Sequence, residues 1–83
     1  MNSAEFVDLD TAILLKENGF DVPCKRYYFT GNGQLQVQEI MVWNWNDMWE
    51  HAYSCPTVEV ANKWIKENGK DITVQACSDN AMG

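Results

Sequence analysis

The same four-residue sequence, Lys-Glu-Asn-Gly, occurs twice in this chain, at residues 16–19 and again at residues 66–69. An apolar, helix-forming segment precedes each copy, and a glycine directly after a helix adopts the left-handed conformation that closes its last turn. The repeat therefore predicts two helices, each followed by an extended segment. A common type of helix ending explains it more simply than duplication of a helix–strand unit, which remains the alternative.

The first of these helices is predicted over residues 11–18, with Asp10 as its N-cap and Gly19 as its stop signal. In such an ending Phe20 would fold back near Leu15. The second helix is predicted to begin after Thr57, which is a suitable N-cap, and to end at Asn68-Gly69.

A β-hairpin is predicted between the two helices. Residues 25–30 are rich in aromatic side chains, the turn is Gly-Asn-Gly at 31–33, and residues 34–38 alternate glutamine with apolar side chains. The alternation of polar and apolar side chains is interrupted at Glu39, which predicts either a β-bulge near this residue or the end of the strand.

The remaining segments complete the predicted topology. The apolar residues of the segment 43–54 follow neither the helical nor the strand period, so it is predicted to form an ordered loop or a short helical turn. Residues 71–77 alternate between apolar and polar side chains and predict a third strand. The whole chain, 1–83, is thus expected to be one α+β domain with an ordered core over about 8–77 and a polar tail at 78–83. Its expected order is helix-strand-strand-helix-strand, with the antiparallel hairpin in a three-stranded sheet and both helices packed on one face of that sheet.

Twelve acidic side chains against six basic ones give the chain a formal net charge of −6. This charge repels a phosphate backbone, which argues against nucleic acid as a partner and favours basic partners or simple solubility. The apolar fraction of 46% is sufficient for a folded core. The sequence starts without a signal peptide and has no apolar stretch that would span a bilayer, so we expect a cytoplasmic protein.

Three widely spaced cysteines, Cys24, Cys55 and Cys77, argue against a disulfide framework and are expected to be reduced. Together with His51 they would supply four zinc ligands, but no Cys-x-x-Cys pair supports such a site, and buried thiols are the favoured interpretation. Cys55 lies next to a predicted helix start and four residues after His51, as a nucleophile would. Because no orienting carboxylate or oxyanion loop accompanies it, we expect no catalysis, no metal and no cofactor.

Four aromatic residues in the loop after the hairpin are the candidate binding residues: Trp43, Trp45, Trp49 and Tyr53. Such side chains can stack on a base, a sugar or a side chain of a partner. A small domain without disulfides also needs bulky aromatics in its core. The core is the favoured location for Trp43 and Trp64, while Trp45 and Trp49 fit either location.

The chain resembles small uncharacterised proteins of Bacteroides-type gut bacteria and their phages. The resemblance covers roughly residues 9–76 and rests on residues 14–21, Pro23-Cys24, Tyr27-Tyr28, Pro56-Thr57 and residues 64–67. It implies no established activity. Members of this group continue into a further strand and an acidic, Ala-rich helix, so this chain is either a natural short version or a truncated one. An apolar sheet face left open by that difference would be available to a partner or to a second copy.

The sequence does not identify a function by itself. Abundant Trp, Tyr and Met without a catalytic constellation favour a non-enzymatic protein-interaction module, such as a phage or mobile-element accessory protein. One alternative is an acidic inhibitor that imitates nucleic acid and blocks a basic host defence protein, and another is self-association through a sheet edge. A third is a binder of small ligands or single-stranded nucleic acid, whose aromatic platform would consist of Lys25, Arg26, Tyr27, Tyr28 and Phe29.

Overall fold

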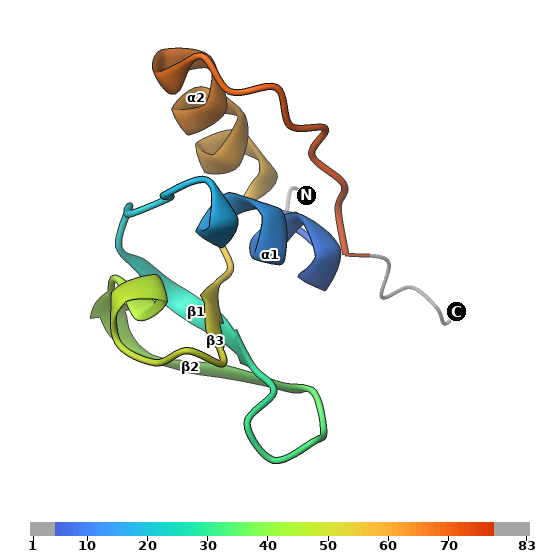
Figure 1. Ribbon diagram of the computed structural model, residues 1–83, viewed down its shortest axis with the longest axis vertical. Helices are drawn as coiled ribbons and strands as arrows, with labels where there is room; N and C mark the ends of the chain where they lie inside the picture. The colour runs from blue at the N-terminus through green and yellow to red at the C-terminus, as the bar shows by residue number, and fades with distance from the viewer. Residues whose placement is uncertain (1–4, 78–83) are drawn as a thin grey trace.

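The computed structural model describes residues 5–77, so the predicted tail 78–83 lies outside the described residues. Its elements follow one another as α1 (Leu9–Glu17), β1 (Cys24–Phe29), β2 (Gln36–Trp43), the 3-10 helix η1 (Trp45–Asp47), β3 (Ala52–Ser54) and α2 (Val58–Asn68) (Figure 1). The predicted α+β class and three-stranded antiparallel sheet are confirmed. The predicted order is wrong in one respect, because the third strand precedes α2 instead of following it.

Strand β1 is the central strand of the sheet, whose order is β2-β1-β3. Tyr28 of β1 lies opposite Val37 of β2 on one side and opposite Tyr53 of β3 on the other. Directly opposite side chains in antiparallel strands point to the same face, and successive side chains point to opposite faces. We therefore call the face that carries Tyr28 the helix face and the face that carries Tyr27 the Trp face.

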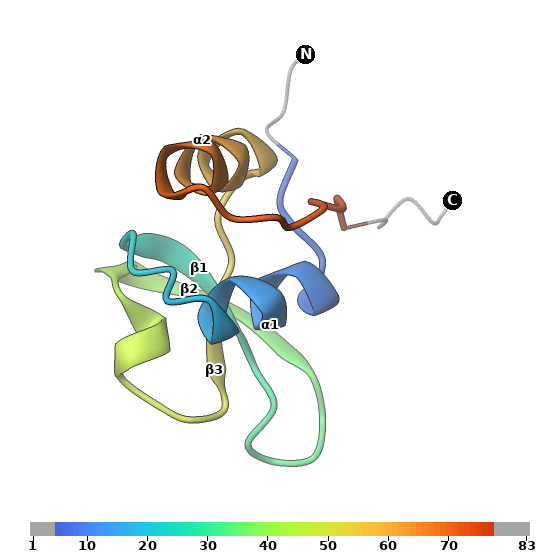
Figure 2. The same cartoon turned by 45° about the horizontal axis from the view of Figure 1, so that its top comes forward.

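Both helices lie on the helix face, as predicted. Lys16 of α1 lies over the ring of Tyr53, whose side chain points to that face. Helix α2 packs beside the end of α1, where the rings of Trp64 and Phe20 meet edge to face at 5.1 Å. Figure 2 shows both helices on one side of the sheet, with the chain after α2 returning past α1.

Helix α1 begins two residues earlier than predicted. Its N-cap is Asp8, whose carboxylate accepts a 2.9 Å hydrogen bond from the amide of Thr11. Asp10, the predicted cap, lies inside the first turn, where its negative charge faces the positive end of the helix dipole. Aspartate is a suitable N-cap at either position, so the residue type does not show which of the two caps the helix.

The two Lys-Glu-Asn-Gly segments end their helices in the same way, as predicted. Gly19 and Gly69 have φ values of 90° and 65°, and the amides of Phe20 and Lys70 reach back to carbonyls in the last turn at 2.9 and 3.0 Å. The asparagine before each glycine also donates its side-chain amide to the carbonyl four residues earlier. The predicted N-cap of α2 is confirmed too, because the hydroxyl of Thr57 accepts from the amide of Val60.

Residues 71–77 do not form the predicted third strand. The segment is extended, and a single bridge between Ala76 and Val7 is its only ladder contact among residues 5–77. Its alternation reflects packing, since Ile72 and Val74 contact the core while Thr73 between them is exposed. The third strand is β3, within the segment predicted to be a loop, and η1 accounts for the helical turn predicted there.

Candidate functional site

The outer strand β2 carries an exposed apolar surface that we call the β2 strip. Its members are apolar residues of β2 or the turn before it, each with about half of its surface open to solvent, from 47% for Trp43 to 63% for Val42. They are Leu35, Val37, Ile40, Met41, Val42 and Trp43. Because β2 is an edge strand and α1 contacts the sheet at the opposite edge, through β3, no helix within residues 5–77 covers the strip.

A β-bulge places four of these residues in succession on the surface. Arg26 pairs with Glu39 and Cys24 pairs with Trp43, so the three residues 40–42 lie opposite Lys25 alone. The bulge predicted near Glu39 is therefore present, and the strand continues beyond it. Extra residues in a bulge lose their ladder partners, which bends the strand and redirects their side chains. Residues 40–43 are consequently all exposed instead of alternating between a buried and a wet face.

The four aromatic residues proposed from the sequence do not form one surface. Trp45 is 2% exposed, and its indole stacks on Tyr27 with 4.1 Å between ring centroids. Trp49 is 47% exposed and lies on the same Trp face beside the ring of Phe29. Trp43 is equally exposed but points to the helix face, because it lies opposite Cys24. Trp45 therefore offers no surface to a partner, and Trp43 is not the core residue that was predicted.

The fourth candidate, Tyr53, is half-buried beneath Lys16. The ammonium group of Lys16 lies 4.8 Å from the centroid of the Tyr53 ring and donates to three backbone carbonyls, at 2.7 Å to Trp49, 2.9 Å to Glu50 and 2.8 Å to Ala52. Burial lowers the pKa of this ammonium group, and the nearby Glu50 carboxylate partly offsets the effect. Lys16 thus fixes the loop between η1 and β3 in place. Its role is structural, and Tyr53 is part of it.

The aromatic platform predicted on the first strand is also part of the core. Tyr27 and Tyr28 are each 3% exposed, and the hydroxyl of Tyr28 donates a 2.7 Å hydrogen bond to the carbonyl of Val7. The guanidinium group of Arg26 lies 3.8 Å from the centroid of the Phe6 ring and forms a 2.7 Å ion pair with Glu39. Neither tyrosine ring is open for stacking on a base.

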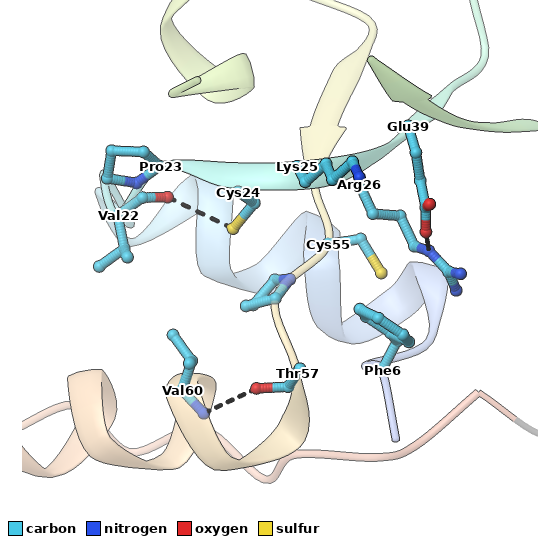
Figure 3. Close-up of a pocket in the computed structure, with 11 residues that line it drawn as sticks. Phe6, Val22, Pro23, Cys24, Lys25, Arg26, Glu39, Cys55, Thr57 and Val60 are labelled. Carbon is cyan, nitrogen blue, oxygen red and sulfur yellow. Dashed lines mark hydrogen bonds and ion pairs between the residues drawn. The ribbon is translucent and has the colours of Figure 1, made fainter. Parts of the chain in front are cut away.

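A groove of about 410 Å³ lies on the helix face between β1 and the start of α2. Figure 3 shows the Cys24 and Cys55 thiols pointing into the space between the strand and the helix, with Arg26 and Glu39 at one end and Val22 and Pro23 at the other. Its lining is mostly apolar, and Glu39 belongs to both the groove wall and strand β2. The groove therefore borders the β2 strip.

The two thiols in this groove are poorly suited to nucleophilic or metal chemistry. Burial raises the pKa of Cys24 to about 12 and that of Cys55 to about 11, although a hydrogen bond with Tyr28 partly counteracts the rise at Cys55. The thiolate is the reactive and ligating form, and here it is disfavoured. In the described range 5–77, no three His, Cys, Asp or Glu side chains gather where a metal ion could be held.

The sequence predicts the binding surface in the loop after the hairpin, and of the β2 strip it identifies only Trp43. The signal was the run of four apolar residues at 40–43, directly after the slip in alternation at Glu39. An exposed run of this length is unusual in a soluble domain. From the sequence, the loss of alternation at this point predicts only a β-bulge or the end of the strand.

No helix among the described residues has the length and apolar character needed to cross a membrane. Comparison of the chain with protein-family models, with curated proteins and with solved structures finds no match in any of the three. The resemblance to small proteins of gut bacteria and their phages therefore stays a prediction.

Proposed function

We propose that this chain is a non-enzymatic protein-interaction module that binds its partner through the β2 strip. The observation that carries the proposal is the succession of four exposed apolar residues, Ile40, Met41, Val42 and Trp43, on an edge strand. Isolated exposed apolar side chains are common on soluble proteins, but contiguous ones mark interaction sites.

The size of the β2 strip supports this proposal. Six residues that each expose about half of their surface amount to on the order of 600 Å² of exposed area along one strand, which is large for a small soluble domain. Trp and Met, two of the residue types in the strip, are enriched at protein interfaces. Covering the strip removes this area from water, which is the main favourable term in association.

The backbone of the strand supports it as well. One side of β2 pairs with β1, and no other strand within residues 5–77 pairs with its other side. Soluble proteins usually protect such an edge with lysine, proline, a β-bulge or an overlying helix. Here the strand carries a single charged residue, Glu39, which is bound to Arg26. Apart from the bulge at residues 40–42, the edge is therefore open to another polypeptide chain.

The proposal keeps the expectation that the chain is not an enzyme. It is supported by the raised pKa values of the two buried thiols and by the structural role of Lys16. Following the resemblance to proteins of gut bacteria and their phages, we propose that this module is a phage or mobile-element accessory protein.

A site-specific photo-crosslinker tests the proposal. We would replace Met41 in the full chain with a photoreactive amino acid, irradiate growing cells of a Bacteroides-type bacterium that produce it, and identify adducts by mass spectrometry. The matched control carries the same amino acid at Leu14, which is exposed to a similar degree on α1. We expect protein adducts from position 41 and few from position 14. Absence of any protein adduct at position 41, the same chain included, would contradict the proposal.

A further inference from the structure

We propose that the partner of the β2 strip is a second copy of this chain, so that two strips pack against each other across a two-fold axis. This inference rests on the proposed function and adds the identity of the partner to it. Three observations fit a second copy: the distribution of charge, the available area and the position of the apolar residues along β2.

Charge is the first observation. The chain has a formal net charge of −6, so two copies repel each other over most of their surfaces. Residues 34–46 contain a single charged side chain, that of Glu39, and its carboxylate is held by Arg26 at 2.7 Å. The β2 strip is thus the surface on which two acidic copies can approach with least repulsion. A basic partner, by contrast, would find no free carboxylate in the strip to bind.

Area is the second observation. An arrangement that brings residues 40–43 of two copies together buries mainly these four residues of each strip, on the order of 400 Å² per copy. Two copies would then bury about 800 Å² together, which is the size of a weak, transient interface. The pairing of two equivalent patches is the commonest arrangement in homodimers. An interface of this size suits a dimer that dissociates at low protein concentration.

The position of the apolar residues is the third observation. Residues 40–43 lie together at one end of β2, and Glu39 precedes them. An antiparallel arrangement with its axis within residues 40–43 places the apolar side chains of one copy against those of the other. The same arrangement separates the two Glu39 carboxylates along the strand direction. The bulge aids this contact because it presents several consecutive side chains outward.

Sedimentation equilibrium of the full chain tests the proposal, over a range from low to high micromolar concentration. We expect the mass to rise from that of one chain to that of two. The variants Ile40→Lys and Val42→Lys place a charge in the strip and should weaken dimerisation by about tenfold or more. Leu14→Lys is the matched control, because it makes a similar change at an exposed position of α1, and it should dimerise like the parent chain. Circular dichroism checks that all three variants fold.

Salt provides an independent readout. Screening reduces the repulsion between two acidic copies, so raising the ionic strength should strengthen dimerisation. Attraction to a basic partner would weaken under the same conditions. Dimerisation that weakens with added salt would overturn the inference.

Two further outcomes would overturn the inference. One is a chain that stays monomeric throughout the concentration range. The other is a dimer that Leu14→Lys disrupts while Val42→Lys leaves it intact. If a monomeric chain still forms adducts from position 41 with a different protein, the proposed function stands and only the identity of the partner is wrong. If it forms no adducts either, both fail.

Discussion

The indole ring of Trp45 stacks on the phenol ring of Tyr27 at a centroid distance of 4.1 Å, and its Nε1 donates a 2.7 Å hydrogen bond to the carbonyl of Cys24. The amide of Trp45 also donates to the hydroxyl of Ser54 in β3. A residue from the connection between β2 and β3 thus covers the Trp face of the sheet and joins its central strand to its shortest one.

The first prediction follows from this contact. Trp45→Ala removes a large buried side chain and leaves a cavity, so it should lower the free energy of unfolding by about 3–5 kcal/mol, which is enough to unfold many small domains. Trp43→Ala is the same substitution at an exposed position and should lower the free energy of unfolding by less than about 1 kcal/mol. Urea denaturation of both variants measures the difference. Equal losses of stability would contradict the assignment of Trp45 to the core.

The second prediction concerns Lys16. Lys16→Met keeps the apolar stem but removes three charge-assisted hydrogen bonds to the carbonyls of Trp49, Glu50 and Ala52. We expect a loss of about 1–3 kcal/mol in the free energy of unfolding, together with faster hydrogen exchange in the loop between η1 and β3. Lys66→Met, at an exposed position of α2, is the control. Loop exchange that stays at the parent rate would show that Lys16 does not hold the loop.

The third prediction concerns the reactivity of the three thiols. Cys24 and Cys55 are buried with raised pKa values, whereas Cys77 is exposed. A thiol reagent at neutral pH should therefore modify one cysteine rapidly in the folded protein and all three after denaturation. Cys77→Ser should abolish the fast phase. Rapid modification of Cys55 in this variant would restore the hypothesis of a nucleophilic cysteine.

The fourth prediction concerns alkaline pH. Thiols in the unfolded chain ionise near the ordinary pKa of 9.0, while the folded protein keeps its protons on Cys55 to about pH 11 and on Cys24 to about pH 12. Burial raises the pKa of the Tyr28 hydroxyl as well. The folded state binds more protons than the unfolded state in this window, so the stability that is fully present below pH 9 falls as the pH rises to about 12.

Chemical denaturation at a series of pH values measures this dependence. The parent chain should lose stability steeply above pH 9, and Cys24→Ala should lose it less steeply because one of the coupled protons is absent. A stability that stays flat between pH 9 and 11 would contradict the burial of these thiols in the folded state.

Features that depend on neighbouring residues were predictable from the sequence. Both helix ends, the Thr57 cap and the hairpin depend on glycine, threonine and alternating side chains within a few positions. Strand β3 was not predictable in this way because its three residues, 52–54, show no period of their own. Contacts distant in sequence hold it, including its pairing with β1 and the bond from its Ser54 amide to the side chain of Asn46.

The candidate site was predictable only in part, for a related reason. An aromatic residue such as Trp43 is buried in a central strand and exposed in an edge strand, and the strand order decides between the two. Sequence alternation specifies which side chains share a face but not which strand lies at the edge. The strand of the hairpin that lies at the edge of the sheet could therefore not be predicted from the sequence.

The bridge between Val7 and Ala76 has a consequence for the time at which the fold can form during synthesis. Val7 is fully buried, and the amide of the next residue, Asp8, donates to the carbonyl of Gln75. These partners leave the ribosome long after residue 7, since chains emerge from their amino-terminal end. The helices and the hairpin can form earlier, but the core around Val7 can close only once the segment after α2 has emerged. Until then the nascent chain exposes this part of its interior as well as the β2 strip.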